Sequence, residues 1–279
     1  MEQKITFVCC PKPFIPDFYD IQHNAIISWT KLKSVDKILI CGNDEGVEQY
    51  AENLSQNIDR KSTEIVYIKH IKVSEFGTPL VDDLFRLGEE YADKYACYIN
   101  ADIILLSDFD NTFDAFCKHI KTNEVQQKLL LVGTRWDWRN PKSIDFEDVE
   151  WQKKAKEEAT NDGVMHAPTG IDYFLFSKGT FPKMHPFALG KFWWDNWIVG
   201  NAFRRQDVIT VDVSSTVFAI HQNSPWFSCG NVDNAFNNIS SGTEYKRNHS
   251  YDPFGRNIAT GTSYKSLKGS DGSIAFVNK

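Results

Sequence analysis

The sequence lacks the features of a secreted or membrane-spanning chain. Within its 279 residues no apolar run approaches the about 18 residues that a membrane-spanning helix needs. The opening residues contain no long apolar segment and lead directly into Pro11, unlike a secretory signal peptide. The six cysteines form no Cys-x-x-Cys pair, so we expect free thiols rather than disulfides or a zinc site. Together these absences predict a cytoplasmic protein without a membrane span.

Several common nucleotide-binding signatures are also missing. No Gly-x-Gly-x-x-Gly follows a strand-like segment and no P-loop is present, which argues against nicotinamide-dependent dehydrogenases and P-loop enzymes. The segment Cys9–Pro13 stands where nucleotidyltransferases usually carry a glycine-rich loop with Arg and Lys. The net charge of −6, from 31 Lys and Arg against 37 Asp and Glu, argues against nucleic acid as the main partner.

The composition is that of a globular chain with many aromatic residues. Hydrophobic residues make up 42% and charged residues 24%, enough to build a sizeable core. Aromatic residues reach 14%, and eight of them are tryptophans. An aromatic ring with a polar atom suits the face of a sugar, while ordinary core packing is the alternative explanation.

The first half of the chain alternates strand-like and helix-like segments. This rhythm predicts an α/β fold with a mostly parallel, twisted sheet covered by helices on both faces. Region 136–168 is polar and charged, and we expect a surface excursion without a core of its own. Two later strands are expected at Gly170–Phe176 and Ile209–His221. The strand-like segments of the first half are Ile5–Cys10, Lys37–Cys41, Glu64–Ile68, Tyr95–Leu105 and Lys128–Thr134.

A polar pair interrupts the most apolar of these segments. Asn100 and Asp102 are two residues apart, so in an extended chain their side chains point to the same face. At the carboxyl end of a central strand that face overlooks the crevice where α/β proteins bind ligands. A carboxylate with a neighbouring amide can hold a divalent cation while a diphosphate completes its coordination. A strand-end turn, in which Asn and Asp cap the next segment, explains the pair equally well.

The segments Phe76–Val81 and Cys97–Leu105 resemble the donor-binding half of GT-A glycosyltransferases, and are most similar to soluble enzymes of bacteria and large DNA viruses. The resemblance implies a Rossmann-like GT-A fold and an Asp-x-Asp-type motif that binds a metal ion and a nucleoside diphosphate. Here Asn100 occupies the first position, so Mn²⁺ or Mg²⁺ would rest mainly on Asp102. The implied donor is a nucleotide sugar, with a UDP-sugar expected.

Two later segments extend the resemblance. The segment Gly190–Trp197 is similar to the aromatic turn that opens the catalytic helix of inverting GT-A enzymes, and it places Asp195 as the general base and Trp194 beside the donor. A carboxylate is ionised at neutral pH and suits that role. The alternative makes Asp195 a helix cap, with the neighbouring tryptophans in the core. Val217–Asn223 resembles the strand that supplies a metal-binding His, which makes His221 the second ligand. A His that serves only packing is the alternative.

Contacts to the donor are expected from several loops. By the resemblance, Pro11 and Asp44 in the loops after the first two strands face the nucleotide, and Thr78 reaches the base or ribose. Arg135 and Asp172 are candidates for holding the donor sugar or the acceptor. Ordinary turn chemistry explains the loop around Asp44 equally well.

The sequence thus predicts one GT-A domain over residues 1–230, with a nucleotide-binding half (1–105) and an acceptor and catalytic half (128–230). Residues 231–279 form a polar extension expected on or near the active site. The predicted activity is metal-dependent, inverting transfer of a sugar to a hydroxyl of a glycan or glycoconjugate. A retaining GT-A transferase and a non-catalytic nucleotide- or sugar-binding protein remain as alternatives.

Overall fold

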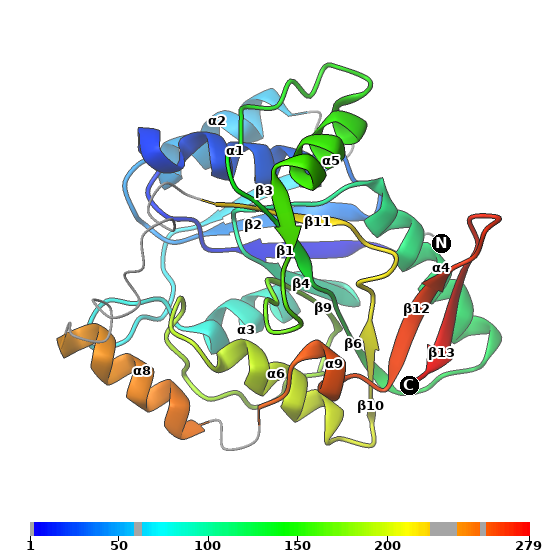
Figure 1. Cartoon of the computed structure of the whole chain (residues 1–279). Helices are drawn as coiled ribbons and strands as arrows, with labels where there is room; N and C mark the ends of the chain where they lie inside the picture. Colours follow the sequence, from blue (N-terminus) through cyan, green and yellow to red (C-terminus); the bar gives the residue numbers. More distant parts are fainter. Residues whose placement is uncertain (1–2, 59–62, 224–238, 252–254) are drawn as a thin grey trace.

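The main sheet of the computed structural model has nine strands in the order β13-β12-β10-β6-β9-β4-β1-β2-β3 (Figure 1). The structure describes residues 3–58, 63–223, 239–251 and 255–279. Strand β9 runs antiparallel to both of its neighbours, β12 and β13 pair antiparallel, and the remaining neighbours are parallel. The strands are β1 (Ile5–Cys9), β2 (Val35–Cys41), β3 (Glu64–Ile68), β4 (Tyr95–Ile99), β6 (Lys128–Val132), β9 (Tyr173–Ser177), β10 (Val208–Asp212), β12 (Tyr264–Lys268) and β13 (Ile274–Asn278).

Helices cover both faces of this sheet. Alternate residues of β1 point to opposite sides, so Phe7 packs with α1, α2 and α4, whereas Val8 packs with α3, α6 and α9. This three-layer arrangement confirms the predicted α/β class with a mostly parallel sheet. The helices are α1 (Pro16–Thr30), α2 (Val47–Asn57), α3 (Val81–Tyr91), α4 (Ser107–Thr122), α5 (Trp151–Asn161), α6 (Trp194–Phe203), α8 (Ile239–Tyr251) and α9 (Ile258–Gly261).

A second, four-stranded sheet lies beside the main one and has the order β5-β11-β7-β8. Its strands come from distant parts of the chain, so it brings the regions around residues 103, 136 and 220 together. Strand β11 pairs antiparallel with β5 and parallel with β7, and β7 pairs antiparallel with β8. The strands are β5 (Ile103–Ile104), β7 (Arg135–Trp138), β8 (Gly163–Met165) and β11 (Ala219–Gln222).

Three predictions about the chain's course need correction. The expected strand 95–105 leaves the main sheet after Ile99, turns, and continues as β5 in the small sheet; Ile103 N–H donates to the Asn100 carbonyl across the turn (3.2 Å). The expected strand 209–221 likewise divides into β10 and β11, which lie in different sheets. Region 136–168 does have a small core, because Trp138, Trp151 and Ile220 bury one another there.

The predicted C-terminal extension contributes to the central fold. Strand β12 pairs with β10, so residues 264–278 extend the main sheet. Five cysteines in the described residues are free thiols, as expected, and Cys229 lies outside them. None of the helices that the structure describes is long and apolar enough to cross a membrane.

Candidate active site at the carboxyl ends of the central strands

Seven polar residues meet where β4, β6 and the small sheet end, and we call this group the polar cluster. It brings five of the predicted site residues together with two others. The parallel pairing of β11 with β7 sets His221 opposite Asp137. The antiparallel pairing of β11 with β5 sets His221 opposite Ile103, which follows the predicted metal ligand Asp102. The members of the polar cluster are Asn100, Asp102, Arg135, Asp137, His166, Asp172 and His221.

One half of the polar cluster centres on Asp172. The Asn100 side-chain amide donates to Asp172 Oδ1 (2.8 Å), and the Tyr98 hydroxyl donates to Asn100 Oδ1 (3.0 Å). Arg135 Nη1 forms an ion pair with Asp172 Oδ2. Both partners of this ion pair are largely buried, with side chains 11% and 9% exposed. Asn100 therefore uses its donor and its acceptor to hold the strand ends in place.

The other half centres on Asp137. Its Oδ1 accepts from Arg135 Nε (2.9 Å) and lies 3.2 Å from His221 Nδ1, while its Oδ2 lies 2.6 Å from His166 Nδ1. Burial disfavours the charge on Asp137, but the nearby His221 imidazole, the hydrogen bond with His166 and the Arg135 charge outweigh burial and hold its pKa below the usual range. Asp137 therefore orients the imidazole that faces the predicted metal ligand.

His221 links the two halves to Asp102. Its Nε2 lies 3.5 Å from Asp102 Oδ2. Burial favours the neutral imidazole, but the charge of Asp102 and the close contacts with the carboxylates of Asp102 and Asp137 outweigh it and raise the pKa of His221 to about 9. Burial likewise opposes the charge on Asp102, and the charges of His221, Lys12 and Arg135 hold its pKa below the usual range. The site thus carries a buried charge network.

Asp102 and His221 have donor atoms that fit a divalent cation sharing its coordination with a diphosphate. Asp102 Oδ1 is buried and has no hydrogen-bond partner among the described residues, although the side chain as a whole is 28% exposed. Carboxylate oxygen suits Mn²⁺, and the His221 imidazole would supply a nitrogen ligand once the metal ion displaces its proton. Across the described ranges, no group of three or more His, Cys, Asp or Glu is arranged to hold a metal ion. A cation would therefore need the donor's phosphate oxygens to complete its coordination.

The start of α6 lies one aromatic layer away from the polar cluster. The Trp194 ring packs against Tyr98 (5.4 Å between centroids) and Phe174 (5.2 Å), and Tyr98 in turn donates to the polar cluster. Trp194 is 6% exposed and belongs to the core, so packing explains it, and its contact with a donor stays a prediction. This packing anchors the first turn of α6, which contains Asp195, at the same edge of the sheet.

Asp195 is the second residue of α6, and the helix cap is Trp193. Asp195 is half-buried, and its Oδ1 accepts from the Asn196 N–H (2.8 Å). Trp193 has φ of 88°, a left-handed conformation that costs a non-glycine residue about 1–3 kcal/mol and is enriched at functional sites. Trp193 is 38% exposed whereas Trp197 is buried, so only one of the three tryptophans presents a ring to solvent beside Asp195. The role of Asp195 as a base stays a prediction.

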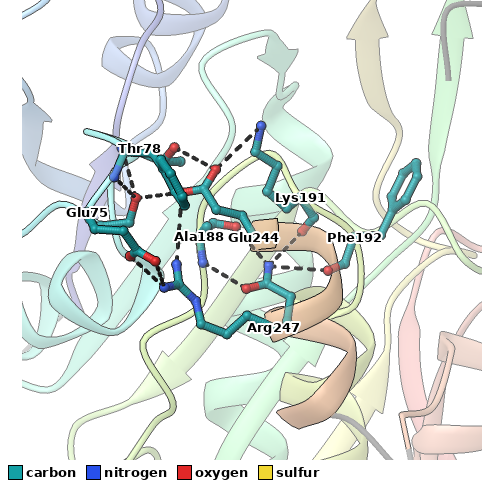
Figure 2. Close-up of polar contacts among 10 residues, drawn as sticks. Glu75, Thr78, Ala188, Lys191, Phe192, Glu244 and Arg247 are labelled. Atoms are coloured by element: carbon teal, nitrogen blue, oxygen red, sulfur yellow. Dashed lines mark hydrogen bonds and ion pairs between the residues drawn. The ribbon is translucent and has the colours of Figure 1, made fainter. Parts of the chain in front are cut away.

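A buried carboxylate on α8 holds the turn that contains Thr78 (Figure 2). Glu244 is 1% exposed; it accepts from the Ser74 hydroxyl (2.5 Å) and the Thr78 hydroxyl (2.9 Å). Arg247, one turn further on α8, donates to both carboxylate oxygens of Glu75 (2.8 and 2.6 Å). The Thr78 hydroxyl is thus engaged by α8, and its contact with the base or ribose stays a prediction.

The same helix also holds the loop that leads into α6. The fully buried Asn248 accepts from the Ala188 N–H (3.0 Å) and donates to the carbonyls of Ala188 (3.0 Å), Lys191 (3.2 Å) and Phe192 (3.4 Å). Lys191 Nζ lies 3.8 Å from Glu244 (Figure 2). One face of α8 therefore determines the position of the backbone directly before the predicted base.

The loops after β1 and β2 contain the last two predicted donor contacts, Pro11 and Asp44. Pro11 is buried, and the Gln22 side chain holds the next residue by accepting from the Lys12 N–H (2.6 Å) and donating to its carbonyl (3.0 Å). Asp44 is exposed and borders a surface hollow of about 540 Å³ that Tyr67 also lines. The predicted contacts of Pro11 and Asp44 with a nucleotide stay predictions.

Sequence reasoning assigned no role to two members of the polar cluster. Asp137 follows Arg135 by two residues, and the period of a β-strand places both side chains on one face, so this spacing was an available signal. His166 carries no such signal, because only the pairing of β8 with β7 brings it to Asp137.

No protein-family model matches this chain, and no curated protein matches it in sequence. Its fold is similar to residues 1–349 of TarS from S. aureus, at 9% identity and a TM-score of 0.34, over 51% of this chain and 38% of that one. It is also similar to the inositol-1-phosphate CTP transferase from T. maritima (12% identity, TM-score 0.46, 88% of this chain and 97% of that one). A third similar structure is assigned as a glucose-1-phosphate thymidylyltransferase from Bacillus anthracis, in complex with a sucrose (13% identity, TM-score 0.44, 92% and 99%).

This chain thus spans well under half the length of the TarS fragment. At these identities and TM-scores, the likenesses assign neither a family nor an activity to the chain.

Proposed function

We propose that this chain is a metal-dependent, inverting glycosyltransferase. It transfers a sugar from a nucleoside diphosphate sugar, with a UDP-sugar expected, to a hydroxyl of a glycan or glycoconjugate. The observation that carries the proposal is the position of His221, which β11 sets between Asp102 and Asp137 at the edge where α6 begins. We further propose that the enzyme acts in the cytoplasm.

The positive side chains around Asp102 support an anionic donor. The charges of Lys12 and Arg135 act on Asp102, so a diphosphate near this carboxylate would meet two cations, and His221 would lose its proton when it binds the metal ion. A Mn²⁺ or Mg²⁺ ion held by Asp102 and His221 would stabilise the negative charge that develops on the leaving diphosphate. Arg135 and Asp172, fixed by their ion pair, would border the sugar.

Asp195 would act on the acceptor. Its carboxylate takes the proton of the acceptor hydroxyl as the acceptor oxygen bonds to the anomeric carbon. The bond from that carbon to the diphosphate oxygen breaks, the nucleoside diphosphate leaves with the electron pair, and the configuration inverts. The position of Asp195 in the first turn of α6 favours its ionised form, because the helix amino terminus carries partial positive charge.

Donor binding is tested by thermal unfolding with a panel of nucleotide sugars and Mn²⁺. A donor at about 100 times its dissociation constant should stabilise the protein by about 2.7 kcal/mol. Asp102→Asn should abolish this stabilisation. Asp207→Asn, at an exposed position beside the start of β10 on the opposite edge, should leave it unchanged. Absence of stabilisation by every nucleotide sugar, with Mn²⁺ or Mg²⁺, would refute the proposal.

The catalytic step is tested with the Asp195→Asn variant and the stabilising donor. We expect donor binding to persist and sugar transfer to fall by at least about 100-fold, as for the loss of a general base. The anomeric configuration of the product, read by NMR, should be inverted. Near-normal turnover of Asp195→Asn with retained configuration would favour the retaining alternative, and donor binding without turnover in the wild type would favour a binding protein.

A further inference from the structure

A groove of about 690 Å³ runs between α1 and α2, and none of its lining residues belongs to the polar cluster. Helix α1 lines it with Tyr19, His23 and Ile27, which recur every four residues and therefore share one face. The loop 144–147 forms a further wall, and buried Asn24 holds that loop by accepting from the Ile144 N–H (3.0 Å). The volume is that of a site for a small ligand rather than of a packing defect.

One end of the groove is formed by the loops that follow β1 and β2. Phe14, in the loop after β1, lines this end, and its N–H donates to the Glu45 carbonyl in the loop after β2 (2.7 Å). From there the groove follows α1 to Lys31. The distance along the helix from Tyr19 to Lys31 is about 18 Å, at about 1.5 Å per residue. The groove is therefore elongated and suits a chain-like ligand.

Aromatic rings line the end of the groove that Phe14 forms. Phe14 and Tyr50 stack at 3.9 Å between centroids with an interplanar angle of 12°, and Tyr19 meets both edge-on at 6.0 Å. His23 stacks on Tyr19, and its Nδ1 is hydrogen-bonded to the Tyr50 hydroxyl (3.1 Å). These contacts fix the rings, yet Tyr19 remains 43% exposed. A rigid ring with an open face is suited to pack against the C–H face of a sugar.

The opposite wall presents carboxamides. Gln49, Asn53 and Asn57 stand four residues apart on α2, line the groove and are exposed. Each carboxamide group offers donors and an acceptor without charge, which matches the hydroxyl groups of a carbohydrate.

The charges in the groove do not favour an anion. Lys31 Nζ lies 3.7 Å from Glu147, and Asp145 and Glu147 add two carboxylates to the same wall. Burial lowers the pKa of His23, so its imidazole is neutral at neutral pH. A phosphate or carboxylate ligand would meet more negative than positive charge here.

We propose that the groove between α1 and α2 binds a neutral oligosaccharide. The exposed Tyr19 ring packs against a sugar face, and the row of carboxamides on α2 exchanges hydrogen bonds with its hydroxyls. The proposal does not require the glycosyltransferase activity proposed above. In a transferase, the groove would hold a part of the glycan that is remote from the reacting hydroxyl.

Saturation-transfer-difference NMR with a panel of neutral tetrasaccharides (cellotetraose, maltotetraose, laminaritetraose and chitotetraose) tests the proposal. At least one should bind the wild type, and Tyr19→Ala and Asn53→Ala should each weaken it by about fivefold or more. Gln56→Ala, at an exposed α2 position that does not line the groove, should bind as the wild type does. Because all three positions are exposed, the variants should fold normally, which circular dichroism checks.

Three outcomes would overturn the proposal. The first is that no tetrasaccharide binds, and the second is that binding survives both Tyr19→Ala and Asn53→Ala. The third is a self-associated protein, seen by analytical ultracentrifugation, that Tyr19→Ala turns into a monomer, since the groove would then be an interface between copies. Failure here is distinct from failure of the proposed function, because donor stabilisation depends on Asp102 and is measured separately.

Discussion

Replacement of Asn248 by alanine should loosen the loop that leads into α6. Asn248 is fully buried; it accepts from the Ala188 N–H, and its two amide hydrogens are shared among the carbonyls of Ala188, Lys191 and Phe192. Asn248→Ala removes these hydrogen bonds and opens a small polar gap beneath the loop. Because the loop runs directly into Trp193 and Asp195, its loosening should, under the proposed function, reduce sugar transfer more than donor binding.

The magnitude follows from the number and quality of these bonds. The two bonds to Ala188 are 3.0 Å long, and those to Lys191 and Phe192 are longer. Each well-formed hydrogen bond contributes about 1 kcal/mol net, and a buried group left without its partner costs more. We therefore expect Asn248→Ala to lower the free energy of unfolding by about 3 kcal/mol. For a domain of this size that corresponds to a fall in Tm of about 6–12 °C.

Urea unfolding measures the loss of stability, and hydrogen exchange measures the loosening of the loop. Amide exchange should accelerate in a peptide covering residues 188–196 and stay unchanged in β1 and β4, which lie in the buried sheet. Lys246→Ala, at an exposed position on the same helix, is the matched control and should change stability by less than about 0.5 kcal/mol. A loss below about 1 kcal/mol, or exchange that accelerates uniformly over the protein, would refute the assignment of Asn248 as a positioning residue.

Two further substitutions probe charge and packing elsewhere in the fold. Burial raises the pKa of Asp108, whose Oδ1 is buried without a hydrogen-bond partner among the described residues, so the wild type gains stability as pH falls toward 3.8. The free energy of unfolding of Asp108→Asn, compared with that of the wild type, should therefore be most favourable near pH 7, and this advantage should shrink toward pH 4. If urea unfolding gives the same difference between the two proteins at both pH values, this prediction is wrong. Gly133→Ala would place its Cβ in overlap with the Tyr173 hydroxyl and 3.3 Å from the Ser214 nitrogen, so we expect a loss of about 2–3 kcal/mol in thermal unfolding. If Gly133→Ala leaves the stability unchanged, the Tyr173 side chain is free to move away from the added Cβ.

Local sequence patterns were sufficient to predict much of the fold. The apolar runs at β1, β2, β3 and β6 are bounded by turn residues and separated by helix-length segments, and all four pair parallel with a neighbouring strand in the main sheet. They could be predicted because period and composition report burial within one segment. Strand β9 is antiparallel to both neighbours, and this direction could not be predicted because it depends on pairing with distant strands.

The candidate site could be predicted only in part. Asn100, Arg135 and Asp172 were expected at one edge of the sheet, and the structure joins them by a hydrogen bond and an ion pair. Thr78 was expected at the nucleotide, but its hydroxyl is held by Glu244, which lies 166 residues further along the chain. That contact depends on where α8 packs, and the polar sequence of α8 does not encode its partner.

By itself, the sequence determined the α/β class and the positions of most buried strands, because hydrophobic periodicity acts over a few residues. The tertiary structure alone decided that the chain turns after Ile99, that β11 sets His221 between Asp102 and Asp137, and that Asn248 holds the start of α6. The last two of these features rest on contacts between residues 60 to 119 positions apart. Such contacts form only when the whole core packs, because the gain from burying distant apolar faces together decides which polar groups meet.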